Sequence, residues 1–164
     1  MKREAILNEI WDAQDRAFDL MTEYDALPHH YGDEILFQAE GRIIDIIAEN
    51  PGITVTDLSC ILRKTSSACS QIVRKLREKG FVEQTRNQKN NRLYNLQLTA
   101  NGLKVYRDHL NFNQNCQEIT FQMLSDFTVE ELNAHVRVQR RINEAYQGDI
   151  QRSREKLAKF KSKK

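Results

Sequence analysis

The stretch from Ser66 to Lys79 carries side chains that could contact a polyanion. Its apolar residues recur at spacings of three and four, which predicts one buried helix face made of Cys69, Ile72, Val73 and Leu76. The opposite face would carry Ser66, Ser67, Ser70, Gln71, Arg74 and Lys75. Hydroxyls near a helix N-terminus let phosphates approach, glutamine can bond a base edge, and arginine can bond guanine or a phosphate. The pattern favours a helix that reads the major groove of duplex DNA, with an ordinary solvated helix face as the competing interpretation.

A polar turn follows, between two predicted strands at residues 81–85 and 93–98. The turn and its flanks carry Arg86, Lys89, Asn90, Asn91 and Arg92. Cations at a hairpin tip suit contacts with phosphates or with a narrow minor groove. A solubilising turn would have the same composition, and it is the preceding helix that favours DNA.

The elements before this pair complete a known order. Apolar periodicity predicts helices at 36–50 and 55–63, separated by Asn50-Pro51-Gly52, with Thr54 or Thr56 as the N-cap of the second. Three helices and then a hairpin is the order of a winged helix-turn-helix, in which one helix braces another that enters the major groove. We therefore predict a mainly α protein whose residues 36–98 form a winged helix-turn-helix DNA-binding domain with a small β-hairpin wing.

Amphipathic helices flank this domain. Residues 4–26 and 100–124 each carry an apolar stripe, and a capping box at Thr128-Val-Glu-Glu131 begins a last helix. We expect that helix to end at Tyr146, because Gly148 follows. A second copy of the chain could bury these stripes, and packing within one chain is the alternative. The predicted organisation is an N-terminal dimerisation helix and linker (1–35), the winged domain (36–98), C-terminal dimerisation helices (99–147) and a basic tail (148–164).

The charge distribution agrees with a polyanion partner. The whole chain carries a net charge of only +2. Residues 36–98 carry +4 and residues 151–164 carry +6, whereas residues 1–35 carry −6 and residues 99–150 carry −2. Basic segments placed between acidic ones suggest contact with a polyanion at defined places, and the tail could add non-specific phosphate contacts.

Three segments resemble the MarR family of bacterial transcriptional regulators: NPGITVTDL (50–58), SQIVRKLREKGFV (70–82) and LTANG (98–102). The resemblance implies a homodimer in which the N- and C-terminal helices interlock. It also implies binding to palindromic operators, usually as a repressor released by a ligand or a redox change.

The same resemblance implies roles for individual residues. The six polar residues of the 66–79 helix occupy the recognition-helix positions, and Arg92 matches an arginine that enters the minor groove. The wing commonly carries an Asp-x-Arg motif, which reads Asn90-Asn91-Arg92 here. An asparagine can accept a hydrogen bond but offers no ion pair, so this wing departs from the family pattern.

A small aromatic or lipophilic effector is a further expectation from the resemblance. A pocket for it between the dimerisation helices and the winged domain could be lined by Trp11, Phe18, Tyr24 and Phe37. Plain core packing is the alternative for each of these aromatic residues.

The cysteines and histidines predict no cofactor. The three cysteines include no Cys-x-x-Cys pair, which argues against a disulfide framework or a structural zinc site. The four histidines are scattered, so we predict no metal site and expect surface or linker histidines. Cys69 is expected in the core and Cys60 nearer the surface, with a redox role for Cys69 as the alternative.

Other function classes lack support in the sequence. We find no hydrolase, phosphate-loop or metalloprotease motif, so an enzyme is not predicted. The sequence has no apolar run long enough to cross a membrane and no apolar stretch typical of a signal peptide, so we expect a cytoplasmic protein. The rival to a DNA-binding regulator is a winged-helix protein-interaction module without sequence-specific DNA binding.

Overall fold

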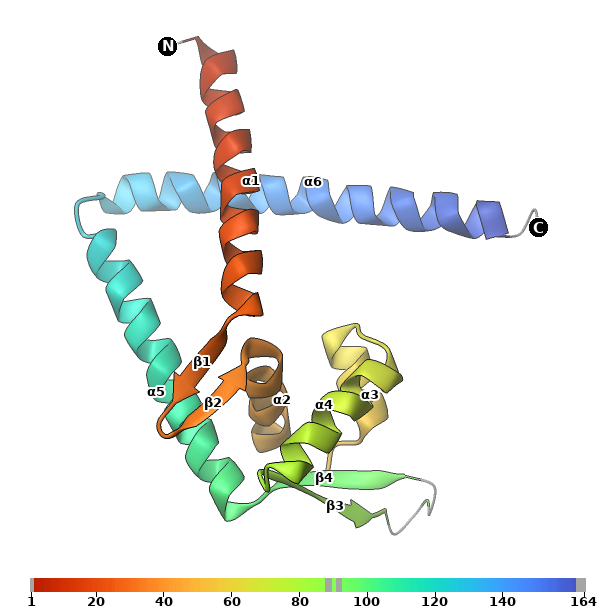
Figure 1. The fold of residues 1–164 in the computed structure, drawn as a ribbon. Helices are drawn as coiled ribbons and strands as arrows, with labels where there is room; N and C mark the ends of the chain where they lie inside the picture. The colour runs from red at the N-terminus through yellow and green to blue at the C-terminus, as the bar shows by residue number, and fades with distance from the viewer. Residues whose placement is uncertain (1, 88–89, 91–92, 162–164) are drawn as a thin grey trace. The chain divides into compact units, whose positions relative to one another are not determined.

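The computed structural model describes residues 2–87, 90 and 93–161 of the chain (Figure 1). Its helices are α1 (Arg3–Ala26), α2 (Gln38–Glu49), α3 (Val55–Leu62), α4 (Ser66–Glu78), α5 (Ala100–Met123) and α6 (Val129–Lys161). Its strands are β1 (Pro28–Tyr31), β2 (Glu34–Phe37), β3 (Val82–Arg86) and β4 (Tyr94–Leu98). The predicted class, mainly helical with a hairpin after the helix-turn-helix, is confirmed. The chain consists of two compact units, residues 1–115 and residues 116–164.

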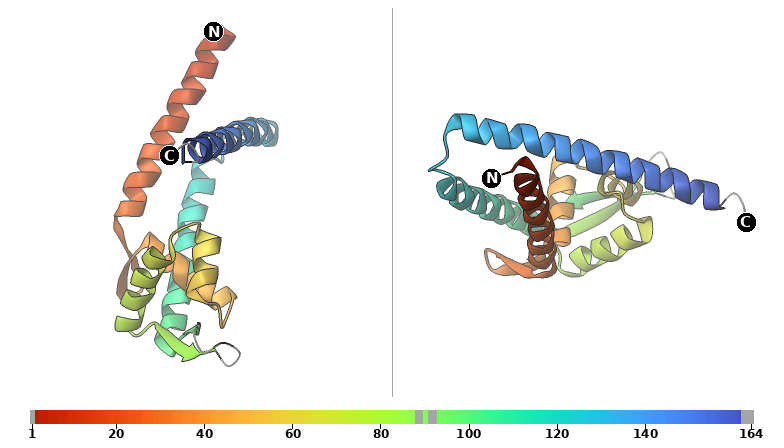
Figure 2. Two further views of the ribbon diagram at one scale, coloured as in Figure 1. Left: turned by 90° about the vertical axis from the view of Figure 1, so that its right-hand side faces the viewer. Right: turned by 90° about the horizontal axis from the view of Figure 1, so that it is seen from above.

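The apolar core of the first unit is centred on α2. Ile43, Ile44 and Ile47 of this helix are fully or almost fully buried, because they repeat on one face at helical spacing. Leu58 of α3 and Leu76 of α4 belong to the same cluster. The left view of Figure 2 shows α2, α3 and α4 grouped together, with β3 and β4 at the lower end of the group. The core therefore holds the helix-turn-helix as one body.

Two capping boxes begin α3 and α6. The Thr54 hydroxyl accepts a hydrogen bond from the backbone N–H of Asp57 at 3.3 Å, and the Asp57 carboxylate accepts one from the Thr54 N–H at 3.0 Å. Thr128 and Glu131 form the same pair at the start of α6. Hydrogen bonds from the threonines lower the pKa of both carboxyl groups. Of the two candidate caps for α3, the structure therefore uses Thr54.

The segment before α2 corrects the sequence prediction. A linker that ends at residue 35 and a helix from Leu36 were expected, but β1 and β2 form an antiparallel hairpin and α2 begins at Gln38. Gly32 makes the turn with a φ of +62°, a conformation that glycine adopts without steric cost. Tyr31 and Leu36 are fully buried. Four residues a strand are too few for a clear period-two pattern, which is why the hairpin was missed.

Helix α6 also differs from its prediction. It continues through Gly148 to Lys161, so the expected end at Tyr146 was wrong. A glycine inside a helix costs only about 1 kcal/mol relative to alanine, which the flanking turns can offset. Arg152 pairs with Asp149, and the Gln151 amide donates to Glu155 at 2.8 Å, both along the helix surface.

His109 is buried, contrary to the expectation of surface histidines. Its Nδ1 lies 2.7 Å from Asp45 Oδ1, and its Nε2 lies 3.4 Å from Asn113 Nδ2. The amide nitrogen of Asn113 can only donate, so Nδ1 carries the proton and donates to Asp45 when the ring is neutral. The ring lies against Gly41, where a Cβ atom would approach Nε2 to 3.0 Å. This contact joins α5 to α2.

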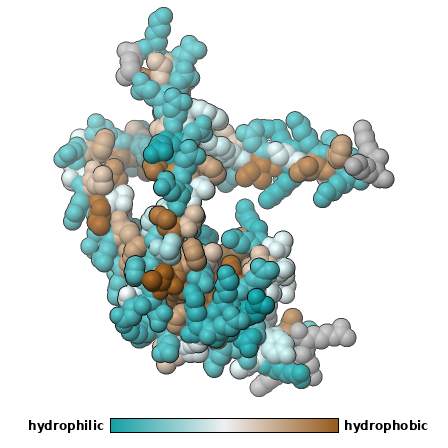
Figure 3. Space-filling view, in the orientation of Figure 1, coloured by the Kyte–Doolittle hydropathy of each residue, from teal (hydrophilic) through white to brown (hydrophobic). Residues whose placement is uncertain are grey.

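Large apolar side chains remain exposed on the other helices. Helices α1 and α6 contain no buried residue, and Phe18 of α1 and Met123 of α5 are 71% and 77% exposed. Figure 3 shows brown, apolar side chains at the surface of α6 and over the β1–β2 hairpin. Within the described ranges, no helix combines the length and apolar character needed to cross a membrane.

The close approach of α5 to Phe81, the residue before β3, predicts a strong effect at Gly102. A Cβ atom there would lie 2.0 Å from the backbone oxygen of Phe81, and the backbone cannot move aside as a flexible side chain can. We expect Gly102→Ala to lower the free energy of unfolding, measured by urea denaturation, by about 1–3 kcal/mol or more.

Gly148→Ala is the matched control for this substitution. A Cβ atom at Gly148 would meet the flexible end of Arg152 at 3.1 Å, in the interior of a helix. Alanine there should leave the free energy of unfolding unchanged or raise it by up to about 1 kcal/mol. Equal effects of the two substitutions would contradict the assigned packing of α5.

Candidate nucleic-acid interface

Helix α4 presents the predicted polar face to solvent. Cys69, Val73 and Leu76 are buried against the core, as their spacing predicted, and Ile72 is partly buried against it. The Thr65 hydroxyl caps the helix by accepting from the Ala68 N–H at 3.2 Å. The exposed side chains are Ser66, Ser67, Ser70, Gln71, Arg74 and Lys75. The structure therefore brings all six predicted contact residues together on one accessible face.

The turn before α4 adds two cations that sequence reasoning missed. Arg63 and Lys64 are exposed beside the N-terminus of α4, where a helix dipole favours phosphate. Arg63 has a φ of 51°, in the left-handed region, and its backbone closes α3. The Ser66 hydroxyl donates to the Ser59 hydroxyl at 3.3 Å, which ties the start of α4 to α3. The signal for both cations was their position directly before the N-cap.

The hairpin β3–β4 forms the wing. Val82 pairs with Leu98 and Arg86 pairs with Tyr94, so Arg86 is exposed at the end of β3 nearest the tip. The exposed Asn90 donates its backbone N–H to Asn87 Oδ1 at 3.0 Å, and Asn87 Nδ2 donates to Asn95 at 2.9 Å. These bonds shape the base of the tip. The predicted contact residues Lys89 and Arg92 lie outside the described residues.

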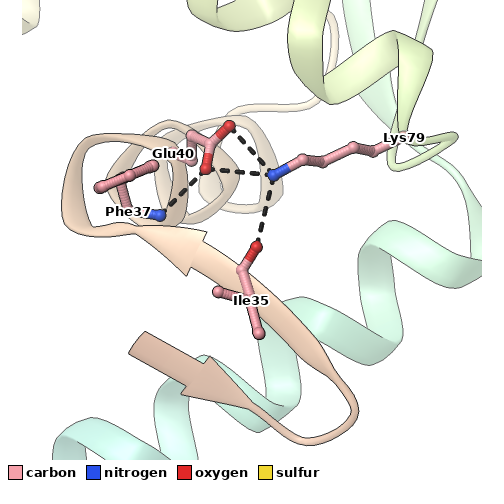
Figure 4. Close-up of polar contacts among 4 residues, drawn as sticks. All are labelled: Ile35, Phe37, Glu40 and Lys79. Carbon is pink, nitrogen blue, oxygen red and sulfur yellow. Dashed lines mark hydrogen bonds and ion pairs between the residues drawn. The ribbon is translucent and has the colours of Figure 1, made fainter. Parts of the chain in front are cut away.

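An ion pair secures the C-terminal end of α4 (Figure 4). Lys79, the C-cap residue, places its Nζ 3.2 Å from both carboxylate oxygens of Glu40 in the first turn of α2. Glu40 also accepts the backbone N–H of Phe37 at 2.9 Å, and Lys79 donates to the backbone oxygen of Ile35 at 3.4 Å. Sequence reasoning missed this contact because its partners are 39 positions apart.

Residues 37–93 match the sequence model of the MarR family. The match covers α2, α3, α4 and β3, and ends at the residue before β4. No curated protein matches the sequence.

Solved structures extend the likeness beyond the MarR segment. Streptococcus pneumoniae FabT in complex with DNA is 20% identical, with a TM-score of 0.64 over 88% of this chain and 98% of that chain. Lactococcus lactis ZitR in complex with DNA is 17% identical, with a TM-score of 0.67 over 82% and 96%. The MarR family transcription regulator SP03579 is 17% identical, with a TM-score of 0.73 over 88% and 95%. The chain therefore shares the MarR fold, flanking helices included.

A cavity of about 590 Å³ lies beside the MarR segment, where α1 approaches the start of α2. Leu20, Met21, Tyr24, Asp25 and Gln38 line it. Tyr24 was among the aromatic residues predicted for an effector pocket. The other three, Trp11, Phe18 and Phe37, are exposed and are not among the lining residues. The structure thus brings one of the four to the cavity, where its neighbours are two apolar and two polar side chains in place of an aromatic cage.

The cysteines of the MarR segment occupy opposite environments. Cys69 is fully buried, and burial raises the pKa of its thiol. Cys60 is exposed on α3. A thiol that stays protonated is a poor nucleophile, so these environments favour the core interpretation of Cys69 over the redox one.

This difference predicts selective alkylation. At neutral pH, iodoacetamide should modify Cys60 in the native protein while Cys69 stays unmodified until urea unfolds the chain, as peptide mass spectrometry would record. Cys60→Ser should remove the fast modification from the MarR segment, while any labelling of the half-exposed Cys116 is followed in its own peptide. Rapid native-state labelling of Cys69 would contradict the assigned burial.

Proposed function

We propose that this protein is a homodimeric DNA-binding transcription regulator that acts as a repressor on palindromic operators. Helix α4 enters the major groove and the β3–β4 wing reaches the adjacent minor groove. One observation carries the proposal: α4 buries Cys69, Val73 and Leu76 while exposing hydroxyls, an amide and cations together on its other face. Such a face matches the donors and acceptors of base edges and phosphates.

The family and the fold support this role. FabT and ZitR, which share the fold, have been solved in complex with DNA. The MarR family consists of transcription regulators, in agreement with the prediction that the chain is not an enzyme. A regulator of transcription works in the bacterial cytoplasm, where the DNA lies.

The exposed apolar helices support a homodimer. Helices α1 and α6 each carry an apolar stripe and contain no buried residue. A second copy of the chain carries the same stripes, and the two copies could bury them against each other. A two-fold dimer presents two α4 helices, which reach successive major grooves when their spacing is about 34–36 Å. Two equivalent reading helices require two equivalent half-sites, which is why we propose a palindromic operator.

The cavity between α1 and α2 supports release by an effector. Leu20, Met21 and Tyr24 give it an apolar wall, and Asp25 and Gln38 add polar groups at its edge. A lipophilic or aromatic molecule with one polar end fits that chemistry. Binding there would shift the protein toward whichever arrangement of its helices binds that molecule better.

A gel-shift titration with the DNA upstream of the gene and of its neighbours tests the proposal. We expect retardation of a fragment that contains an inverted repeat, with an affinity that falls steeply as salt rises, because phosphate contacts release counterions. The rival function, a protein-interaction module, predicts no salt-sensitive shift on any fragment.

Arg74→Ala tests the reading face itself. Its guanidinium lies 3.7 Å from Glu78 Oε1 with both side chains exposed, so its removal should change stability little. If Arg74 reads a base, operator discrimination should fall by about 1–3 kcal/mol; if it contacts a phosphate, affinity should fall on all sequences. Arg42→Ala, at an exposed position of α2, is the charge-matched control and should bind normally. Unchanged binding by the Arg74 variant would refute the assigned face.

A further inference from the structure

The two ends of α4 are held by different kinds of contact. At its N-terminus, the helix is capped by Thr65 and bonded through Ser66 to Ser59. Along its length, it is held by apolar packing, which has no strong directional preference. At its C-terminus, it is held by the ion pair of Lys79 with Glu40. The Thr99 hydroxyl also donates to the backbone oxygen of Gly80 at 2.6 Å, directly after this end. The ion pair is the directional contact made by a side chain of the helix cap itself, so it can fix the rotation and the tilt of this end.

The environment of Glu40 separates this pair from ordinary surface ion pairs. The Glu40 side chain is only 6% exposed, and that of Lys79 is 37% exposed. The Glu40 carboxylate accepts hydrogen bonds from both the Phe37 N–H and the Lys79 ammonium group. Leaving a buried carboxylate without its cation costs considerable free energy. The Glu40 carboxylate therefore holds the Lys79 ammonium in place. Figure 4 shows that Lys79 crosses from α4 to the start of α2.

We propose that Lys79 and Glu40 are positioning residues for DNA recognition, which set the angle at which α4 enters the groove. The inference rests on the proposed DNA-binding function. Base contacts need their side chains held within about 0.5 Å of the productive geometry. Phosphate contacts on random DNA tolerate more displacement, because they are carried by charge. Loss of the pair therefore lowers discrimination more than it lowers general affinity.

Substitution of Glu40 separates an effect of charge on DNA affinity from an effect of helix position on operator discrimination. Glu40→Gln removes a negative charge and leaves an oxygen that can still accept the Phe37 N–H. Charge alone predicts that this variant binds DNA more tightly, whereas Lys79→Met binds more weakly. A positioning role predicts that both variants lose operator discrimination.

The experiment measures affinity for the operator fragment and for a random duplex of equal length, at several salt concentrations. The variants are Lys79→Met, Glu40→Gln and the double variant, with thermal melting of each. We expect each single variant to lower the ratio of operator to random affinity about tenfold, and the double variant to lower it no further. Lys79→Arg should keep most of the ratio, since the cation remains.

Arg77→Met is the matched control, because Arg77 is an exposed cation at the same end of α4 that makes no ion pair with the described residues. It should leave the ratio unchanged.

Independent, multiplicative effects of Lys79→Met and Glu40→Gln would overturn the inference. So would a lowered melting temperature with an unchanged ratio, or equal losses on both duplexes with a reduced salt slope, which would make Lys79 a phosphate contact. If Lys79→Met fails to fold, the Glu40→Gln and Lys79→Arg results decide. Absence of salt-sensitive binding by the wild type would instead overturn the proposed function, and this inference with it.

Discussion

The burial of one face of α2 is the constraint on which the rest of the first unit depends. Ile43, Ile44 and Ile47 form the centre of the apolar cluster, and α3, α4, β3 and β4 each contribute residues to it. Burying an isoleucine contributes roughly 1.5–3 kcal/mol, so these three together contribute several kcal/mol to the cluster. Because α4 buries its apolar face in this cluster, its polar face must point to solvent. The candidate interface is thus a consequence of the core.

Polar contacts and close approaches then specify the geometry that apolar burial leaves open. The buried ring of His109 is bonded to Asp45 and lies against Gly41, which fixes the approach of α5 to α2. Gly102 lets the start of α5 approach the backbone of Phe81. The pair of Glu40 and Lys79 does the same for the end of α4. The first turn of α2 has an additional neighbour, since Gln38 lines the cavity beside α1.

Local features of this protein could be predicted from sequence, and contacts between distant segments could not. The inward and outward residues of α4, the Thr128 capping box and the wing strands all follow from periodicity or from motifs a few residues long. The hairpin of residues 28–37 was missed because each strand has four residues. Gly148 was wrongly taken as the end of a helix, because the free-energy cost of one glycine is smaller than the stabilisation that the neighbouring helical turns provide. The bonds of His109 and of Lys79 join residues 64 and 39 positions apart, and no local pattern reports them.

The stability of the outer helices is a separate matter from the core. An amphipathic helix in water gains most of its stability from burying its apolar face. Helix α1 extends over 24 residues with none buried, although Phe18 and Met21 lie on its apolar stripe. In the proposed dimer, a second chain would cover that stripe, so the order of α1 would depend on protein concentration as the folding of obligate dimers does. The winged segment has its own core and needs no such cover. Association would act on DNA binding by joining two reading helices, because two weak half-site contacts made by one linked pair give one strong interaction.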